Sequence, residues 1–135
     1  MSALTRFFFS PVYAPRSTWS VVNWWESRRA LYNLTVGAAG IMTVVTVTLL
    51  SWIHPHPLPF RVPLGPILLY AFMANLFYTM GPLVDVFIHR TWGPEYAPVG
   101  PAMFRYGFVF SVGLTLLPIP LAVMAWVARL FFAGM

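Results

Sequence analysis

The chain contains no cysteine and no lysine, and it has only three acidic residues among 135. The missing cysteine excludes disulfides, thiolate clusters and covalent haem attachment, and the missing lysine excludes Schiff-base chemistry. Charged residues make up 8% of the chain, whereas an ordinary soluble domain has about 25%. We therefore expect lipid, not water, to surround most of the chain. So few reactive side chains favour a protein that is not an enzyme.

Three long apolar segments dominate what is present, near residues 31–53, 64–88 and 103–128. Each is long enough to cross the hydrocarbon layer, which needs about 20 helical residues. The sequence therefore predicts an all-α membrane protein with three transmembrane helices and an N-terminal interfacial arm. Residues 1–30 would form the arm and the start of the first helix, and residues 31–135 the three-span bundle. No room remains for a separate soluble domain.

The N-terminal arm, residues 1–22, alternates aromatic residues, proline and serine without a clear period. We expect an irregular segment on the membrane surface. The run Phe7–Phe9 is too short for the apolar region of a signal peptide, because Pro11 interrupts it. A helix is predicted to start at Asn23, where Glu26 stands three residues later and can complete a capping box.

A helix from Asn23 to Ile53 would be about 45 Å long, which exceeds a hydrocarbon core of about 30 Å. Its first two turns must then lie in the headgroup layer. These turns carry the aromatic and basic side chains expected at a membrane interface. They are Trp24, Trp25, Arg28, Arg29 and Tyr32.

Proline interrupts the other two spans. Pro82 is expected to kink the second span in its last third. Pro118 and Pro120 lie near the centre of the third span, where they leave the carbonyls of Leu114 and Leu116 without their usual helical donors.

The arginines predict the orientation of the chain, since cytoplasmic flanks and short loops carry more basic residues. With three spans, the arm and the loop 89–102 share one side, and the loop 54–63 lies on the other. Six arginines on the first side stand against two on the second, which predicts a cytoplasmic N-terminus and a periplasmic C-terminus. The six are Arg6, Arg16, Arg28, Arg29, Arg90 and Arg105; the two are Arg61 and Arg129.

Membrane lipids are the first expected partner, and they account for the net charge of +5 without nucleic acid. Anionic headgroups attract arginines that flank apolar spans. The arginines expected to contact them are Arg28, Arg29, Arg90 and Arg105.

Asn75 stands near the middle of the second span, where an amide without a partner is costly. Thr43 in the first span and Thr115 in the third fall at similar depth. We expect hydrogen bonds among them to lock the three helices together. A place on a polar permeation path is the alternative.

Small residues at four-residue spacing predict the faces on which helices pack closely. The second span lacks such a stripe, so we expect its aromatic side chains to fill gaps or to face lipid. The predicted stripes are Thr35, Ala39 and Thr43 on the first span and Gly107, Ser111 and Thr115 on the third.

Asp85 is the single acidic residue within a span, and an intramembrane carboxylate is a functional candidate. We expect Arg28, Arg29, Arg90 and Arg105 to gather at the same interface with Glu26. A compensated ion-pair cluster is therefore the simplest interpretation. The alternatives are a proton or ion relay, and acid–base chemistry with His89, which lies one turn away.

The histidines do not predict a haem or a metal site. His54 follows the first span and His89 the second, so they lie on opposite sides of the bilayer. His54 and His56 share a loop but lack a third ligand. We therefore expect no cofactor, no metal and no catalytic residue.

Two segments resemble a family of small uncharacterised bacterial inner-membrane proteins. The first, from Trp25 to Leu34, reads W-E-S-R-R-A-L-Y-N-L; the second, from Ala74 to Gly81, reads A-N-L-F-Y-T-M-G. The family shares W-E-x-R-R-x-x-Y-N-L and A-N-x-x-Y-T-x-G motifs. The resemblance covers the first two spans and implies the bacterial cytoplasmic membrane. It implies no activity and no role for any residue.

The function that these features favour is that of a non-catalytic accessory, assembly or stabilising subunit of a larger membrane complex, respiratory or photosynthetic. Other membrane-protein subunits would then be its partners. The alternative is an oligomeric transporter or channel protomer with Asp85 and Asn75 on the path. A lipid-directed membrane enzyme would have Asp85, Glu26 and His89 to draw on, but no nucleophile is evident.

Overall fold

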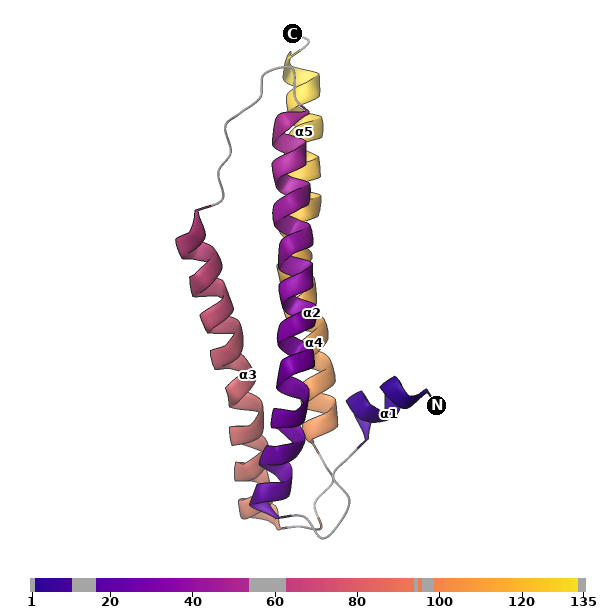
Figure 1. Ribbon diagram of the computed structural model, residues 1–135, viewed down its shortest axis with the longest axis vertical. Coiled ribbons are helices and arrows are strands. Elements are labelled where there is room, and N and C mark those ends of the chain that lie inside the picture. The colour runs from indigo at the N-terminus through magenta and orange to yellow at the C-terminus, as the bar shows by residue number, and fades with distance from the viewer. Residues whose placement is uncertain (1, 11–16, 54–62, 94, 96–98, 134–135) are drawn as a thin grey trace.

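The computed structural model describes residues 2–10, 17–53, 63–93, 95 and 99–133. Within these residues the chain forms helices and no strand (Figure 1). The helices are α1 (Ala3–Phe9), α2 (Thr18–Trp52), α3 (Leu64–Trp92), α4 (Gly100–Leu116) and α5 (Pro118–Ala133).

Three segments are long and apolar enough to cross a membrane, namely α2, α3 and the stretch Gly100–Phe132, which joins α4 to α5. The predicted all-α fold with three candidate transmembrane helices is therefore confirmed. Each helix is longer than its predicted apolar core, because it continues into the region where Trp and Arg replace aliphatic residues. The His54-Pro55-His56 segment, Arg16 and Arg61 lie outside the described residues.

The predicted start of the first long helix at Asn23 is wrong, because a capping box lies six residues earlier. The Ser17 hydroxyl accepts from the Ser20 backbone N–H at 3.1 Å, and the Ser20 hydroxyl accepts from the Ser17 N–H at 2.9 Å. This reciprocal pair satisfies N–H groups that the helix start leaves free. Glu26 therefore has no capping role.

The prediction of an irregular arm over residues 1–22 is also wrong in part. Ser2 caps the short helix α1, whose last turn is followed by Ser10. The Trp24 indole N–H donates to the Ser10 carbonyl at 2.8 Å, and α1 packs against α4. The described part of the arm is thus partly helical and packs against α4.

The two proline sites behave differently. Pro82 lies inside α3, which runs unbroken to Trp92 and ends at Gly93 with φ of 83°, a conformation that favours glycine. Pro118 begins a new helix, so Leu117 divides the third span into α4 and α5. The interruption lies where the prolines predict it.

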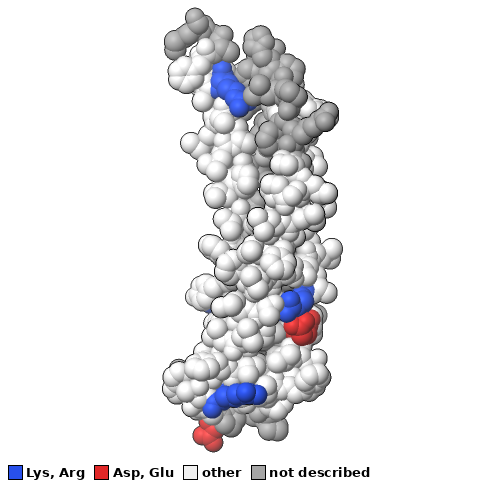
Figure 2. Space-filling view, turned by 90° about the vertical axis from the view of Figure 1, so that its left-hand side faces the viewer, with Lys and Arg blue, Asp and Glu red and all other residues white. Residues whose placement is uncertain are grey.

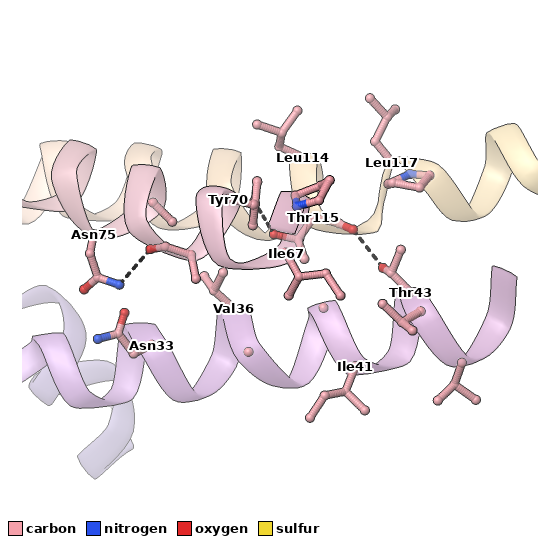
Figure 3. Close-up of a pocket in the computed structure, with 18 of the residues that line it drawn as sticks. Asn33, Val36, Ile41, Thr43, Ile67, Tyr70, Asn75, Leu114, Thr115 and Leu117 are labelled. Atoms are coloured by element: carbon pink, nitrogen blue, oxygen red, sulfur yellow. Dashed lines mark hydrogen bonds between the residues drawn. The ribbon is translucent and has the colours of Figure 1, made fainter. Parts of the chain in front are cut away.

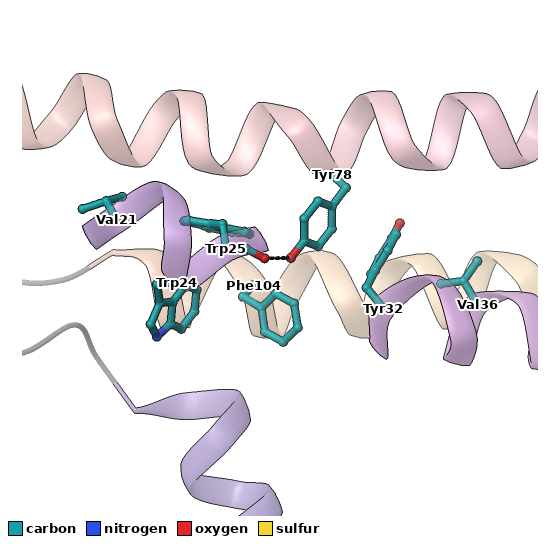
Figure 4. Packing of buried hydrophobic residues seen from close by; sticks show 7 residues of the cluster. All are labelled: Val21, Trp24, Trp25, Tyr32, Val36, Tyr78 and Phe104. Carbon is teal, nitrogen blue, oxygen red and sulfur yellow. Dashed lines mark hydrogen bonds between the residues drawn. The ribbon is translucent and has the colours of Figure 1, made fainter. Parts of the chain in front are cut away.

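The hydrophobic core lies at one end of the bundle and is mainly aromatic (Figure 4). It joins the first half of α2 to the last half of α3 and the start of α4. No described residue of α5 is buried. The cluster consists of Val21, Trp24, Trp25, Tyr32, Val36, Tyr78 and Phe104.

Helix α2 is the central element, since α3, α4 and α5 all pack against it. Helix α3 runs close to α2 at the core end and diverges from it toward Leu64 (Figure 1). We call the core end the packed end and the opposite end the open end.

The hydrogen bond from Thr43 to the break in the third span is the basis of a first prediction. The Thr43 hydroxyl donates to the Thr115 carbonyl at 2.8 Å, and both residues are buried. Thr43→Val is expected to lower the free energy of unfolding in detergent by about 0.6–1.7 kcal/mol, the range for interhelical hydrogen bonds in membranes. Thr35→Val is the control, because the Thr35 hydroxyl bonds within its own helix to Leu31. Equal losses for the two variants would contradict the predicted role.

Candidate functional site

Trp25 holds three helices together at the packed end. Its indole N–H donates to Asp85 Oδ2 of α3 at 3.0 Å, and its carbonyl accepts from the Tyr78 hydroxyl at 2.7 Å. Its ring meets those of Tyr78 and Phe104 edge-on, at centroid distances of 5.6 and 5.9 Å. Figure 4 shows Trp25 and Tyr78 joined in this way. One side chain therefore fixes α2 against both α3 and α4.

Glycine allows this close approach. A methyl group added at Gly81 would lie 2.5 Å from the Trp25 ring, and one added at Gly100 would overlap the Asp85 carboxylate. Gly81 and Pro82 are themselves buried. The contact face of α3 is thus built from Ala74, Gly81 and inward-facing Tyr78, although the sequence shows no small-residue stripe there.

Asp85 is not the centre of an ion-pair cluster, so that prediction is wrong. The carboxylate is 7% exposed, and its partner within the described residues is the Trp25 indole. Gly100 lies close against this carboxylate on the side of α4.

The predicted arginine partners of Asp85 have other contacts. Arg28 is buried over the Trp24 ring, 3.9 Å from the ring centroid, and Nη1 donates to the Trp24 carbonyl at 2.9 Å. Arg105 is exposed and lies over Tyr106, 5.1 Å from the ring centroid. Arg90 is exposed as well. These contacts are cation–π pairs of the kind that stabilise Arg at aromatic surfaces.

Arg29 forms the ion pair of this end, with Glu26 of its own helix. Two nitrogens of the guanidinium donate to the two carboxylate oxygens at 2.8 and 2.7 Å. The same group donates to the Thr79 hydroxyl of α3 at 3.3 Å. The predicted set of charged residues is therefore divided into separate groups, of which only Glu26 and Arg29 form an ion pair within the described residues.

On the face shown in Figure 2, charged side chains lie near the top and in the lower third, and the surface between them is uncharged. This pattern matches a hydrocarbon-spanning middle and two polar interfaces. The chain also has 59% hydrophobic residues, so the uncharged surface is mostly apolar.

A groove of about 870 Å³ opens where α3 diverges from α2, with the α4–α5 junction as its floor (Figure 3). Its walls are largely aliphatic. They include Val36, Ile41, Ile67, Leu114 and Leu121.

Hydroxyl groups at the floor of the groove and next to it form hydrogen bonds between the helices. The Tyr70 hydroxyl and the Thr115 hydroxyl share a hydrogen bond of 2.5 Å, and Thr43 donates to the Thr115 carbonyl. The Tyr32 hydroxyl donates to Ser111 at 2.9 Å. Gly107 does not belong to this contact face, because it is exposed and an added methyl group would meet nothing.

The prediction that Asn75 locks the three helices is wrong. Its side-chain N–H donates to the Ala71 carbonyl of its own helix at 3.1 Å. It makes no hydrogen bond to Thr43 or Thr115, because both lie farther along the bundle toward the open end, whereas Asn75 is level with Asn33 (Figure 3). The longer side chain of Tyr70 reaches Thr115 instead.

Asn33 was missed as a candidate site residue, although it belongs to the Y-N-L motif. Its side chain faces Asn75 across one end of the groove (Figure 3). No hydrogen bond to it occurs within the described residues. The available signal was an amide side chain one helical turn beyond Arg29, inside an apolar span.

No group of three His, Cys, Asp or Glu side chains that could hold a metal ion occurs in the described chain. The groove contains amides and hydroxyls as its polar groups. This arrangement can bind an apolar guest and donate or accept hydrogen bonds at one end.

The contact between Trp25 and Gly81 gives a second prediction. Gly81→Ala should destabilise the protein by about 1–3 kcal/mol, because the added methyl overpacks a rigid indole. Gly107→Ala is the matched control, since its methyl meets nothing; it should be neutral or stabilise by up to about 1 kcal/mol through helix propensity. Thermal unfolding in detergent measures both. A Gly81→Ala protein as stable as Gly107→Ala would contradict the close approach.

Comparison with known proteins gives no match: no protein-family model, no curated protein and no solved structure matches this chain.

Proposed function

We propose that the chain is a non-catalytic subunit of a larger membrane complex, in which it assists assembly or stability. The observation that carries the proposal is the exposure of the last span. In the most apolar stretch of Gly100–Phe132, 6% of the residues are buried within the chain. The corresponding stretches of the other two spans have 17% of their residues buried.

The exposure is greatest on α5. One face of this helix, with Ile119, Ala122 and Trp126, is partly buried. The opposite face presents Met124 and Phe131, which are seven residues apart and therefore lie on one side of the helix. Transmembrane helices associate through such faces when another chain packs against them.

The packed end supports the same role. Three polar contacts hold helices together there: the Trp25 indole with Asp85, the Tyr78 hydroxyl with the Trp25 carbonyl, and Arg29 with the Thr79 hydroxyl. A rigid end joined to an exposed helix is suited to a subunit that is built into a complex.

A transporter or channel protomer is less well supported. That function would need Asp85 and Asn75 on one path, but the two are ten residues apart on α3, about 15 Å along the axis. The buried rings of Trp25, Tyr78 and Phe104 pack against one another beside this stretch.

The proposal also includes a location. The excess of arginine at the packed end favours a cytoplasmic position for that end, in the bacterial inner membrane. Five of the six arginines assigned to this side belong to the described residues. Of the two assigned to the opposite side, Arg129 is described and lies near the C-terminus.

Photo-crosslinking from α5 tests the subunit role. A photoreactive phenylalanine analogue replaces Met124 or Phe131 in cells that make the chain at its natural level, and Phe104, which is 2% exposed, is the inward control position. We expect one adduct of constant mass from both outward positions and none from Phe104. The partner found in the adduct should also co-purify with the unlabelled chain in mild detergent, at a fixed ratio of partner to chain. Adducts with a second copy of this chain, or no protein adduct at all, would contradict the proposal.

A further inference from the structure

The two rims of the groove are polar at the packed end and become apolar toward the membrane interior. Residues four apart stand above one another on one face of a helix, and α2 and α3 run antiparallel. The residues that face one another, from the packed end inward, are Arg29 with Thr79, Asn33 with Asn75, and Gly37 with Ala71.

The first level carries the charged groups, which places it at the membrane interface in this proposal. Arg29 bonds to Thr79 across the two helices and pairs with Glu26, whose side chain is 46% exposed. The second level, with the two asparagines, lies one turn deeper, about 6 Å toward the interior. Beyond it the rims carry mainly small and aliphatic side chains, and the hydroxyls of Tyr70 and Thr43 are already bonded to Thr115 at the floor.

The two asparagines retain unused hydrogen-bonding groups. Asn75 uses one N–H on Ala71, which leaves its amide oxygen and second N–H unbonded within the described residues, and Asn33 makes no hydrogen bond there. Hydrocarbon offers no replacement partner, so such groups are costly unless something binds them. An ester carbonyl accepts hydrogen bonds from amide N–H groups of this kind.

The dimensions of the groove select the guest. A volume of about 870 Å³ falls within the ~300–1,000 Å³ typical of small-molecule sites. From Asn33 to Val45 the groove follows α2 for about 18 Å, whereas a spanning helix needs contact through a core of about 30 Å. A chain that ends inside the bilayer fits this length better than a helix that crosses it.

We propose that the groove binds one glycerophospholipid from the leaflet at the packed end, with an ester carbonyl at Asn33 and Asn75 and an acyl chain along Gly37 and Ala71. The headgroup then lies at the level of Arg29. Because Glu26 already neutralises this guanidinium, the site should bind zwitterionic and anionic headgroups about equally. Met124 and Phe131 of α5, which serve the subunit role, do not line this groove.

Gly37 offers a direct way to block the acyl chain. A methyl group added there would meet nothing within 4 Å, because the position faces the open groove. Gly37→Leu therefore fills the groove without a clash and removes a residue unfavourable in helices. Gly107→Leu is the matched control, since Gly107 also faces open space but lies outside the groove.

Native mass spectrometry of the full chain measures the bound lipid. The protein is reconstituted into vesicles of palmitoyl-oleoyl phosphatidylethanolamine or phosphatidylglycerol, extracted in mild detergent and washed. We expect one retained phospholipid per chain for the natural protein and for Gly107→Leu, from either vesicle. Gly37→Leu should lose it, and Asn33→Leu with Asn75→Leu should retain it about tenfold less, as the loss of one or two hydrogen bonds predicts.

Several results would overturn the site. Equal phospholipid retention by Gly37→Leu and Gly107→Leu would do so, as would the absence of retained phospholipid in the natural protein. A third such result is an isoprenoid quinone or a partner helix in the groove of protein extracted from its own membrane. Ala71→Leu, on the opposite rim, repeats the block if Gly37→Leu does not fold. The α5 crosslinks should be unchanged in all these variants, so that failure of this site and failure of the subunit role remain distinguishable.

Discussion

The structure depends on the packing of the Trp25 indole against a glycine on the neighbouring helix. Gly81 leaves room for the ring, and the ring in turn reaches Asp85 with its N–H and Phe104 with its edge. Without a hydrophobic driving force between helices in lipid, close packing and hydrogen bonds must hold them together. This one contact supplies both, and it sets the distance between α2, α3 and α4 at the packed end.

The open end follows from the same constraint. No described contact of similar closeness holds the first half of α3 to α2, so the helices diverge from the level of Asn75 toward Leu64 (Figure 1). The floor of the resulting groove stays closed because Tyr70 and Thr43 both bind Thr115. Packing at one end and divergence at the other thus produce a polar-rimmed groove and leave α5 exposed.

The sequence predicted the number of spans and the break at Pro118, because both follow from local properties: segment length, hydropathy and the geometry of proline. It did not predict the partners of the polar residues. Charge alone pairs Asp85 with arginine, but its partner is the indole of Trp25. The position of this tryptophan near the interface suggests instead that its ring faces the lipid headgroups. Hydropathy places Asn75, Thr43 and Thr115 at similar depth, but the helix register puts Asn75 closer to the packed end than the two threonines (Figure 3). Such partners depend on interhelical distances, which one-helix patterns do not contain.

The central claim is that α2 and α3 are close at the packed end and separate at the open end. The chain has no cysteine, so two cysteines can be introduced and each labelled with one nitroxide. The distance between the two labels is then measured in lipid vesicles by pulsed electron paramagnetic resonance. Ala30 with Met80 reports the packed end, and Val45 with Leu64 the open end; all four positions are exposed. The structure predicts a short, narrow distribution for the first pair and a longer one for the second. Equal, narrow distances for both pairs would show that the helices lie side by side throughout, and would contradict the account.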